Sequence, residues 1–251
     1  MGPVTNQTCL AFLYPGYSAE DDYLRLAAMV SPPVEVVVVH TSVGVDAHRV
    51  DDLLDLGSRE RLLEGARQLD TDRVAVAMWA CTSGSFVFGW DGAHEQVDDI
   101  HREIGIPVSS TSLAFVEALR VLDARRVAVA ATYPVDVAER FAEFLSVGGV
   151  DVVSLVSEDI LTAEEVGAVD GDRVVRFVCA ADHGDADVVL VPDTALHTAA
   201  WLSDLEKAIG KPVLTANQVT FWEALRLTGR RPRATRLGRL FAASAVDVEV
   251  S

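Results

Sequence analysis

Short apolar segments rich in valine alternate with longer amphipathic segments along the chain. This alternation is typical of βαβ units, in which helices connect the strands of a parallel sheet. Uninterrupted runs such as Val36–Val39 suit strands that helices cover on both faces. We predict strands at Cys9–Tyr14, Val34–His40, Arg73–Trp79, Ile106–Ser109, Val127–Ala131, Val150–Val156, Val188–Val191 and Pro212–Thr215.

The segments between these strands place apolar residues three and four positions apart, which predicts amphipathic helices. The expected helices are Ala19–Met29, Asp46–Leu69, Ala93–Ile104, Thr111–Leu122, Asp136–Ser146, Thr162–Asp182, Leu196–Ile209 and Gln218–Thr228.

The residues that follow the predicted strands repeat along the chain. Tyr14 and a proline follow the first strand, and Tyr133 and a proline follow the fifth, 119 residues later. The turn at Cys81 corresponds to the turn at Asp193, 112 residues later. We infer two similar four-stranded, flavodoxin-like α/β halves related by a pseudo-two-fold axis. Residues 1–118 form the first half and 119–227 the second, and 228–251 pack back on the first.

Composition narrows the class of protein. The 251 residues are half hydrophobic and carry a net charge of −17, from 21 basic and 38 acidic side chains. Such a surface argues against nucleic acid and anionic membranes as partners. We find no apolar run of the roughly 18 residues that cross a bilayer and no signal-peptide pattern, and three cysteines without paired spacing suit a reducing compartment. We therefore expect a cytoplasmic protein. The acidic surface is compatible with a homo-oligomer.

In open α/β sheets, ligands bind at the carboxyl ends of the strands. If the two halves face each other, the turns at Tyr14, Cys81, Tyr133 and Asp193 converge on one cleft. We expect the active site between the halves. These turns contain no lysine or arginine, so an anionic ligand would be held by N–H groups and hydroxyls.

The turn after the third strand carries the clearest chemical signal. Cys81 stands where a strand ends and a helix begins, a position that favours thiolate. Thr82 and Ser83 add hydroxyl and N–H groups that can hold an anion. The alternative is a buried small residue followed by an ordinary helix cap.

Asp193 has two readings as well. It can cap the helix that follows, or it can face Cys81 as a general acid or base. Other polar side chains near strand ends are candidates for substrate binding, although tyrosines also line ordinary clefts and Asn217 can simply cap the last helix. They are Thr194, Tyr14, Tyr133 and Asn217.

The remaining reactive side chains receive ordinary structural roles. We expect Cys9 and Cys179 in the core, and His48, His94 and His101 at the surface on charged helical segments. His197 lies nearer the site, inside its expected helix. The sequence contains no Walker loop, dinucleotide-binding glycine motif, Cys-x-x-Cys or His-Glu-x-x-His. We therefore expect neither a cofactor nor a metal.

Three segments together resemble the aspartate/glutamate racemase superfamily, in the branch of maleate cis-trans isomerase and arylmalonate decarboxylase. They are Ala80-Cys81-Thr82-Ser83-Gly84-Ser85, Val127–Tyr133, and Pro212-Val213 leading to Phe221-Trp222-Glu223-Ala224-Leu225. The resemblance extends to Gly238-Arg239-Leu240-Phe241. It implies two α/β halves and cofactor-independent chemistry next to a carboxylate of a small acid.

Residue by residue, the resemblance places the first-half cysteine of the superfamily on Cys81. The position of its second-half cysteine falls on Asp193, and Thr82, Ser83 and Tyr133 match positions that hold the substrate carboxylate. The chain departs from the pattern of this superfamily branch in three ways. Asp193 replaces a cysteine. Arylmalonate decarboxylase has its cysteine in the second half and a glycine in the first. The isomerases tend to carry asparagine in the first loop, where this chain has Pro15–Ser18.

These features leave four readings. In the preferred one, an isomerase uses Cys81 as a nucleophile that adds to the double bond of an unsaturated diacid, with Asp193 as acid or base. The alternatives are a decarboxylase of the arylmalonate type, an amino-acid or hydantoin racemase, and a retired protein that only binds a carboxylate.

Overall fold

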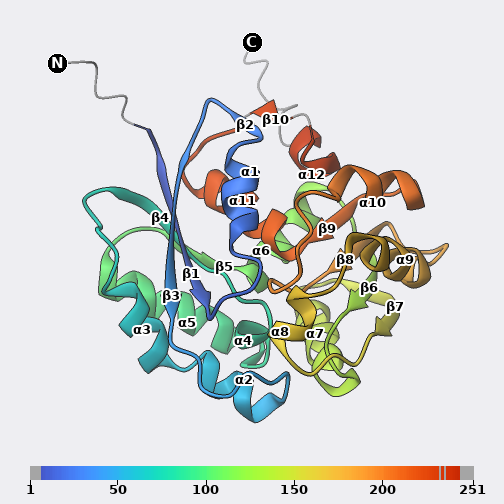
Figure 1. Cartoon of the computed structure of the whole chain (residues 1–251), viewed down its shortest axis with the longest axis horizontal. Helices are drawn as coiled ribbons and strands as arrows, with labels where there is room; N and C mark the ends of the chain where they lie inside the picture. The colour runs from blue at the N-terminus through green and yellow to red at the C-terminus, as the bar shows by residue number, and fades with distance from the viewer. Residues whose placement is uncertain (1–6, 232, 235, 244–251) are drawn as a thin grey trace.

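Two parallel four-stranded sheets form the framework of the computed structural model, which describes residues 7–231, 233–234 and 236–243 (Figure 1). The first sheet has the order β3-β1-β4-β5 and the second the order β7-β6-β8-β9. The strands are β1 (Cys9–Pro15), β3 (Glu35–Thr41), β4 (Val74–Trp79), β5 (Val108–Ser110), β6 (Arg126–Ala131), β7 (Asp151–Ser157), β8 (Val188–Val191) and β9 (Val213–Thr215). The predicted α/β fold with two sheets is confirmed, and so are the eight predicted strands.

The two sheets have the same topology. In each, the first strand in chain order lies between the second and the third, and the fourth lies beyond the third. Leu13 of β1 pairs with Val39 on one side and Trp79 on the other, so β1 is central. In the same way β6 lies between β7 and β8.

Helices connect the strands. Those before β6 are α1 (Asp21–Ala27), α2 (Val50–Leu56), α3 (Arg59–Ala66), α4 (Ser83–Phe86), α5 (Gly89–Ile104) and α6 (Thr111–Val121). Those after it are α7 (Val135–Val147), α8 (Ala163–Gly167), α9 (Gly171–Ala181), α10 (Leu202–Ile209), α11 (Ala216–Leu227) and α12 (Gly238–Ala243). Within the described ranges, none of these helices has the length and apolar character needed to cross a membrane.

The predicted helix at 46–69 was wrong as one element, because it divides at Gly57. A side chain there would place its Cβ 2.0 Å from the carbonyl oxygen of Gly84. The end of α2 therefore lies directly against α4. Gln96 of α5 donates to the carbonyl oxygens of Gly57 and Gly84, at 2.8 Å each, and so holds the end of α2 against α4.

Two other helix predictions need correction. The segment 162–182 divides into α8 and α9, because Asp170 caps α9 by accepting from the N–H of Arg173 at 2.8 Å. The helix expected from Leu196 begins only at Leu202.

The C-terminal segment contacts both halves. Its strand β10 (Arg233–Ala234) pairs antiparallel with β2 (Val30–Ser31), an unpredicted pairing with the first half. Helix α12 instead lies against α10 and β9 of the second half as well as α6. Residues 244–251 of the segment expected to return to the first half lie outside the described residues.

Helices α6 and α11 occupy the centre of the molecule, between the two sheets (Figure 1). Each follows the edge strand of its own half, and most of its side chains are buried. The hydroxyls of Thr111 and Thr220 are 2.7 Å apart across their contact. One hydrophobic cluster includes Phe12, Phe115 and Phe221, so the two halves share a core.

A buried carboxylate ties α1 to a loop of the second half. Asp22 is 1% exposed, and its Oδ2 accepts from the N–H groups of Thr198 and Ala199 at 2.8 and 3.0 Å. Asn217 of α11 donates to the same oxygen at 3.4 Å. These bonds hold the loop between β8 and α10 in place.

We expect Asp22→Ala to lower the free energy of unfolding by about 1–3 kcal/mol, because buried N–H groups lose their acceptor. Urea unfolding measures the change. The matched control is Asp21→Ala, whose exposed carboxylate pairs with His197 and should contribute about 0–1 kcal/mol. Equal effects of the two substitutions would contradict the anchoring role of Asp22.

Candidate active site

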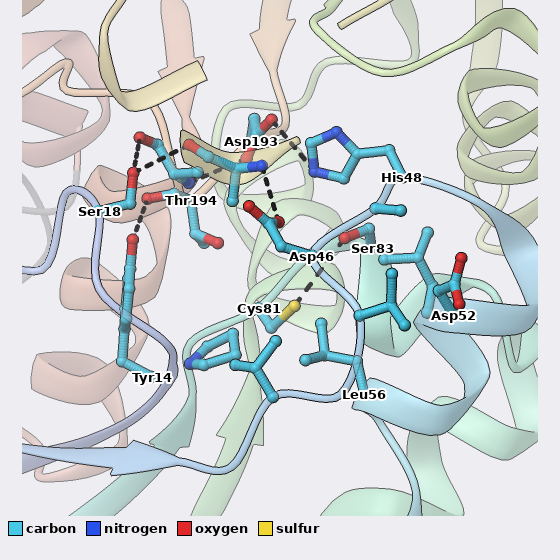
Figure 2. A pocket seen from close by; sticks show the side chains of 17 residues that line it. Tyr14, Ser18, Asp46, His48, Asp52, Leu56, Cys81, Ser83, Asp193 and Thr194 are labelled. Atoms are coloured by element: carbon cyan, nitrogen blue, oxygen red, sulfur yellow. Dashed lines mark hydrogen bonds and ion pairs between the residues drawn. The ribbon is translucent and has the colours of Figure 1, made fainter. Parts of the chain in front are cut away.

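A cavity of about 50 Å³ lies where the carboxyl ends of β1, β4 and β8 meet (Figure 2). Both halves of the chain contribute to its wall. The lining residues are Tyr14, Pro15, Ser18, Val43, Val45, Asp46, Ala47, His48, Asp52, Leu53, Leu56, Cys81, Ser83, Ala163, Asp193, Thr194 and Ala195. The site residues Cys81, Ser83, Asp193, Thr194 and Tyr14, chosen from the sequence, are therefore brought together.

Cys81 follows β4 and is 3% exposed. Its sulfur accepts from the N–H of Gly84 at 3.3 Å and lies 3.9 Å from the hydroxyl of Ser83. A Cβ on Gly84 would approach that sulfur to 3.1 Å, so glycine leaves the sulfur its space. Burial raises the pKa of the thiol to about 12, and the charge of Asp193 adds to the rise. The resting side chain is therefore a thiol.

Asp193 follows β8 and is 3% exposed. Its Oδ1 accepts from the N–H of Ala195 at 2.9 Å, and its Oδ2 accepts from the hydroxyl of Thr132. Nε2 of His48 lies 4.0 Å from the same Oδ2. Asp193 does not cap α10, because that helix begins nine residues later at Leu202. Its carboxylate instead stabilises the turn in which it lies.

The hydroxyl of Thr82 is buried and has no hydrogen-bond partner among the described residues. A buried hydroxyl without a partner is costly unless a ligand satisfies it. The phenol of Tyr133 donates to the carbonyl of Pro192 at 2.6 Å. Burial raises the pKa of Tyr133 strongly, and the nearby charge of Asp193 adds to the rise. Tyr133 and Thr82 thus lie beside the cavity without being among its lining residues.

The phenol of Tyr14 accepts from the N–H of Ala19 and donates to the carbonyl of Thr194, both at 3.0 Å. Asn217 is fully buried in α11 and does not line the cavity. Its amide nitrogen donates to the same carbonyl of Thr194 at 3.1 Å. These two side chains therefore position the loop that carries Asp193.

The expectation that His48 lies at the surface was wrong. Its side chain is 6% exposed and lines the cavity, whereas His94 and His101 are exposed as expected. His197 lies outside the cavity and pairs with Asp21 at 2.9 Å. No motif marks His48 in the sequence, because its position depends on contacts with residues more than 100 positions later.

Cys9 is buried as expected, but Cys179 is exposed on α9, so its predicted place in the core was wrong. Its neighbours Val174 and Val178 face the core instead. Among the described residues, no three His, Cys, Asp or Glu side chains gather as metal ligands would.

The cavity is acidic and partly apolar. Its charged lining side chains are the carboxylates of Asp46, Asp52 and Asp193, and His48 is the one that can become positive. Lysine and arginine do not occur among these lining residues.

Two α/β halves of the same topology, with a thiol and a carboxylate facing a shared cavity, define a two-half α/β protein whose candidate site lies between the halves. A model of the family described as arylmalonate decarboxylase matches residues 54–241. The chain is 31% identical over 185 residues to an arylmalonate decarboxylase from Bordetella bronchiseptica, a match that covers 72% of this chain and 77% of that protein. The chain therefore belongs to the arylmalonate decarboxylase and maleate isomerase family, and the resemblance found in the sequence is confirmed.

Maleate isomerases are also relatives. The chain is 25% identical over 184 residues to the maleate isomerase of Alcaligenes faecalis, which covers 70% of this chain and 72% of that protein. Among solved structures, a liganded arylmalonate decarboxylase double mutant matches with a TM-score of 0.82 at 27% identity, over 94% of this chain and 98% of that one. A maleate isomerase from Pseudomonas putida S16 has the same fold, with a TM-score of 0.82 at 19% identity over 94% and 99%.

We expect alkylation of Cys81 by iodoacetamide to accelerate about tenfold per pH unit from about pH 8 to pH 11, because a pKa of about 12 keeps the thiolate fraction growing over that range. Peptide mapping of Cys179→Ser protein by mass spectrometry measures it. Asp193→Asn should shift the profile to lower pH, because it removes a charge that raises the pKa of the thiol.

The control for this profile is the same protein unfolded in guanidinium, where alkylation should level off above about pH 9. A folded protein whose alkylation rate also levels off there would contradict the raised pKa of Cys81.

Proposed function

We propose that the protein catalyses cis–trans isomerisation of a small unsaturated dicarboxylic acid without a cofactor, with maleate as the test substrate. The observation that supports this proposal is the cavity itself. A protonated thiol, Cys81, and a carboxylate, Asp193, reach it from different halves of the molecule. Together they supply a nucleophile and a group that can carry its proton.

Cavity size favours a small ligand. A cavity that binds benzene measures about 150 Å³, roughly three times the 50 Å³ found here. A four-carbon diacid and an aryl-substituted acid both exceed this volume, and the aryl acid would require the larger movement of the wall. Maleate isomerases among the relatives agree with this choice.

One substrate carboxylate would lie against the turn that follows β4. The unpartnered hydroxyl of Thr82 and the hydroxyl of Ser83 are the donors in this proposal, with Tyr133 beside them. Thr194 and Tyr14 complete the opposite wall. Neutral donors of this kind stabilise the charge that develops on a carboxylate during reaction.

The chemistry then proceeds in three steps. The sulfur of Cys81 bonds to one carbon of the double bond while its proton passes to Asp193, and the electron pair of the double bond moves onto the adjacent carboxylate as an enediolate. Rotation occurs about the new single bond. The electron pair returns, the C–S bond breaks to leave the trans double bond, and Asp193 returns the proton to sulfur. A Nocardia farcinica maleate isomerase mutant of the same fold is described with a covalently bound succinylcysteine intermediate.

Decarboxylation of a small malonate is the second candidate, favoured by a specific observation. A thiol with a pKa of about 12 is a proton donor at neutral pH, and loss of CO₂ leaves an enediolate that needs one proton. Cys81 would supply it. The 31% identity to an arylmalonate decarboxylase agrees with this reading.

Proton NMR in D₂O distinguishes the reactions when the protein is incubated with maleate, methylmalonate, phenylmalonate and aspartate. We expect conversion of maleate to fumarate. Cys81→Ala and Cys81→Ser should lower kcat at least about 10³-fold because the nucleophile is lost, and Asp193→Asn about 10²–10⁴-fold because a proton carrier is lost. Cys179→Ser, an exposed cysteine outside the cavity, is the control and should keep the wild-type rate.

Each other outcome identifies an alternative. Loss of CO₂ from a malonate without conversion of maleate would identify a decarboxylase instead of an isomerase. Incorporation of deuterium at the α-carbon of aspartate would identify a racemase. Binding of an acid without any reaction would leave a carboxylate-binding protein. Full activity of Cys81→Ala would remove the nucleophile from the mechanism.

A further inference from the structure

His48 belongs to the first half, but the second half holds its ring. Nδ1 lies 3.0 Å from the carbonyl oxygen of Ile160, and a carbonyl only accepts, so Nδ1 carries the hydrogen. The ring also packs edge-on against Tyr133, with centroids 4.9 Å apart. In the neutral ring, Nε2 therefore presents a lone pair.

That lone pair faces Asp193. Nε2 lies 4.0 Å from Oδ2, a distance too long for a hydrogen bond. Two buried acceptors thus stand side by side at the cavity (Figure 2). Two segments of the second half set their spacing, because Ile160 after β7 donates its N–H to the carbonyl of Thr132 after β6 at 2.8 Å, and Thr132 donates its hydroxyl to Asp193.

Further contacts hold the His48 loop against this part of the second half. The N–H of His48 donates to the carbonyl of Leu161 at 2.6 Å. The carboxylate of Asp46 accepts from the N–H groups of Ala163 and Glu164 at 2.9 and 3.3 Å. The segment 160–164 of the second half therefore holds the segment 46–48 in place. The direction of the His48 ring toward Asp193 does not depend on a ligand.

The surroundings of the ring are negative. Titratable groups face the cavity from the His48 loop itself, from α2, and from the turns after β4 and β8, and Tyr133 packs on the ring. They are Asp46, Asp52, Cys81, Asp193 and Tyr133. Three of these groups are carboxylates, and the lining residues include no lysine or arginine to pair with them.

We propose that His48 is a proton-relay residue that acts through Asp193, so that the two side chains exchange protons as one unit. The inference rests on the proposed function. When sulfur bonds to the substrate, the thiol proton reaches Asp193 and turns Oδ2 into a donor. The protonated carboxyl then closes the 4.0 Å gap to Nε2 of His48 and passes the proton on, leaving an imidazolium beside a carboxylate. When the C–S bond breaks, the proton returns by the same route.

The kinetic test uses two replacements of His48 in the full chain. His48→Asn keeps an amide donor near the place of Nδ1 and removes Nε2, whereas His48→Gln keeps a polar group nearer to Nε2. We expect His48→Asn and His48→Gln alike to lower kcat for maleate at least about tenfold with KM changed less than about twofold, because neither amide can take up a proton. The variant with both His48→Asn and Asp193→Asn should be no slower than Asp193→Asn alone. If the two side chains act as one relay, removing Asp193 already abolishes the contribution of His48. Added imidazole should restore part of the rate of His48→Asn.

Nitrogen NMR of protein labelled with ¹⁵N-histidine tests the pair without any substrate. We expect the neutral His48 ring to carry its hydrogen on Nδ1, and the Nε2 signal to move in Asp193→Asn while the signals of His94 and His101, both exposed on α5, stay in place. A hydrogen on Nε2, or an unmoved signal, overturns the relay whatever the reaction is.

The two proposals can fail separately. A wild-type protein that does not convert maleate overturns the proposed function, even with the expected NMR spectra. Wild-type kcat in His48→Asn, or independent effects in the double variant, overturns the relay while the isomerase stands. A purely structural role would instead lower the thermal stability of His48→Asn and leave its kcat without rescue by imidazole.

Discussion

The packing of α6 against α11 is the constraint on which the rest of the structure depends. Both helices follow the edge strands of their sheets, and their burial on most sides joins the two halves through one core. This contact fixes the carboxyl ends of β4 and β8 relative to each other. Cys81 and Asp193 consequently face one cavity, although neither half contains both side chains.

Electrostatics at the cavity follows from this enclosure. Burial and the nearby charge of Asp193 keep Cys81 protonated, so its reactivity must be released by a substrate and a proton acceptor. The lining carries several carboxylates and no lysine or arginine. An anion bound there would be held by hydroxyl and N–H groups, which act at short range despite the net charge of −17. The surface charge and the chemistry of the site are thus separate properties.

Much of the fold and part of the site could be predicted because their signals are local. Valine-rich runs mark the strands, and the residues just after a strand lie at the carboxyl edge of its sheet, so Cys81 and Asp193 were found by position. The break at Gly57 was missed although its signal is local, because Gly57 ends α2 and Ser58 opens α3 with extended backbone. His48 was misplaced because Ile160 and Leu161, more than 100 positions later, hold it.

By itself, the sequence determined the two-half α/β architecture, the family and the turns that carry the reactive side chains. These depend on short-range periodicity and on residue identity at strand ends. Only the tertiary structure decided which side chains share the cavity and how they are oriented. It brought His48 to Asp193, turned Asn217 and Tyr14 toward the backbone of Thr194, and buried the thiol of Cys81. The contacts of His48 with Asp193 and of Tyr14 with Thr194 join residues from different halves, and no local pattern encodes the distance between them.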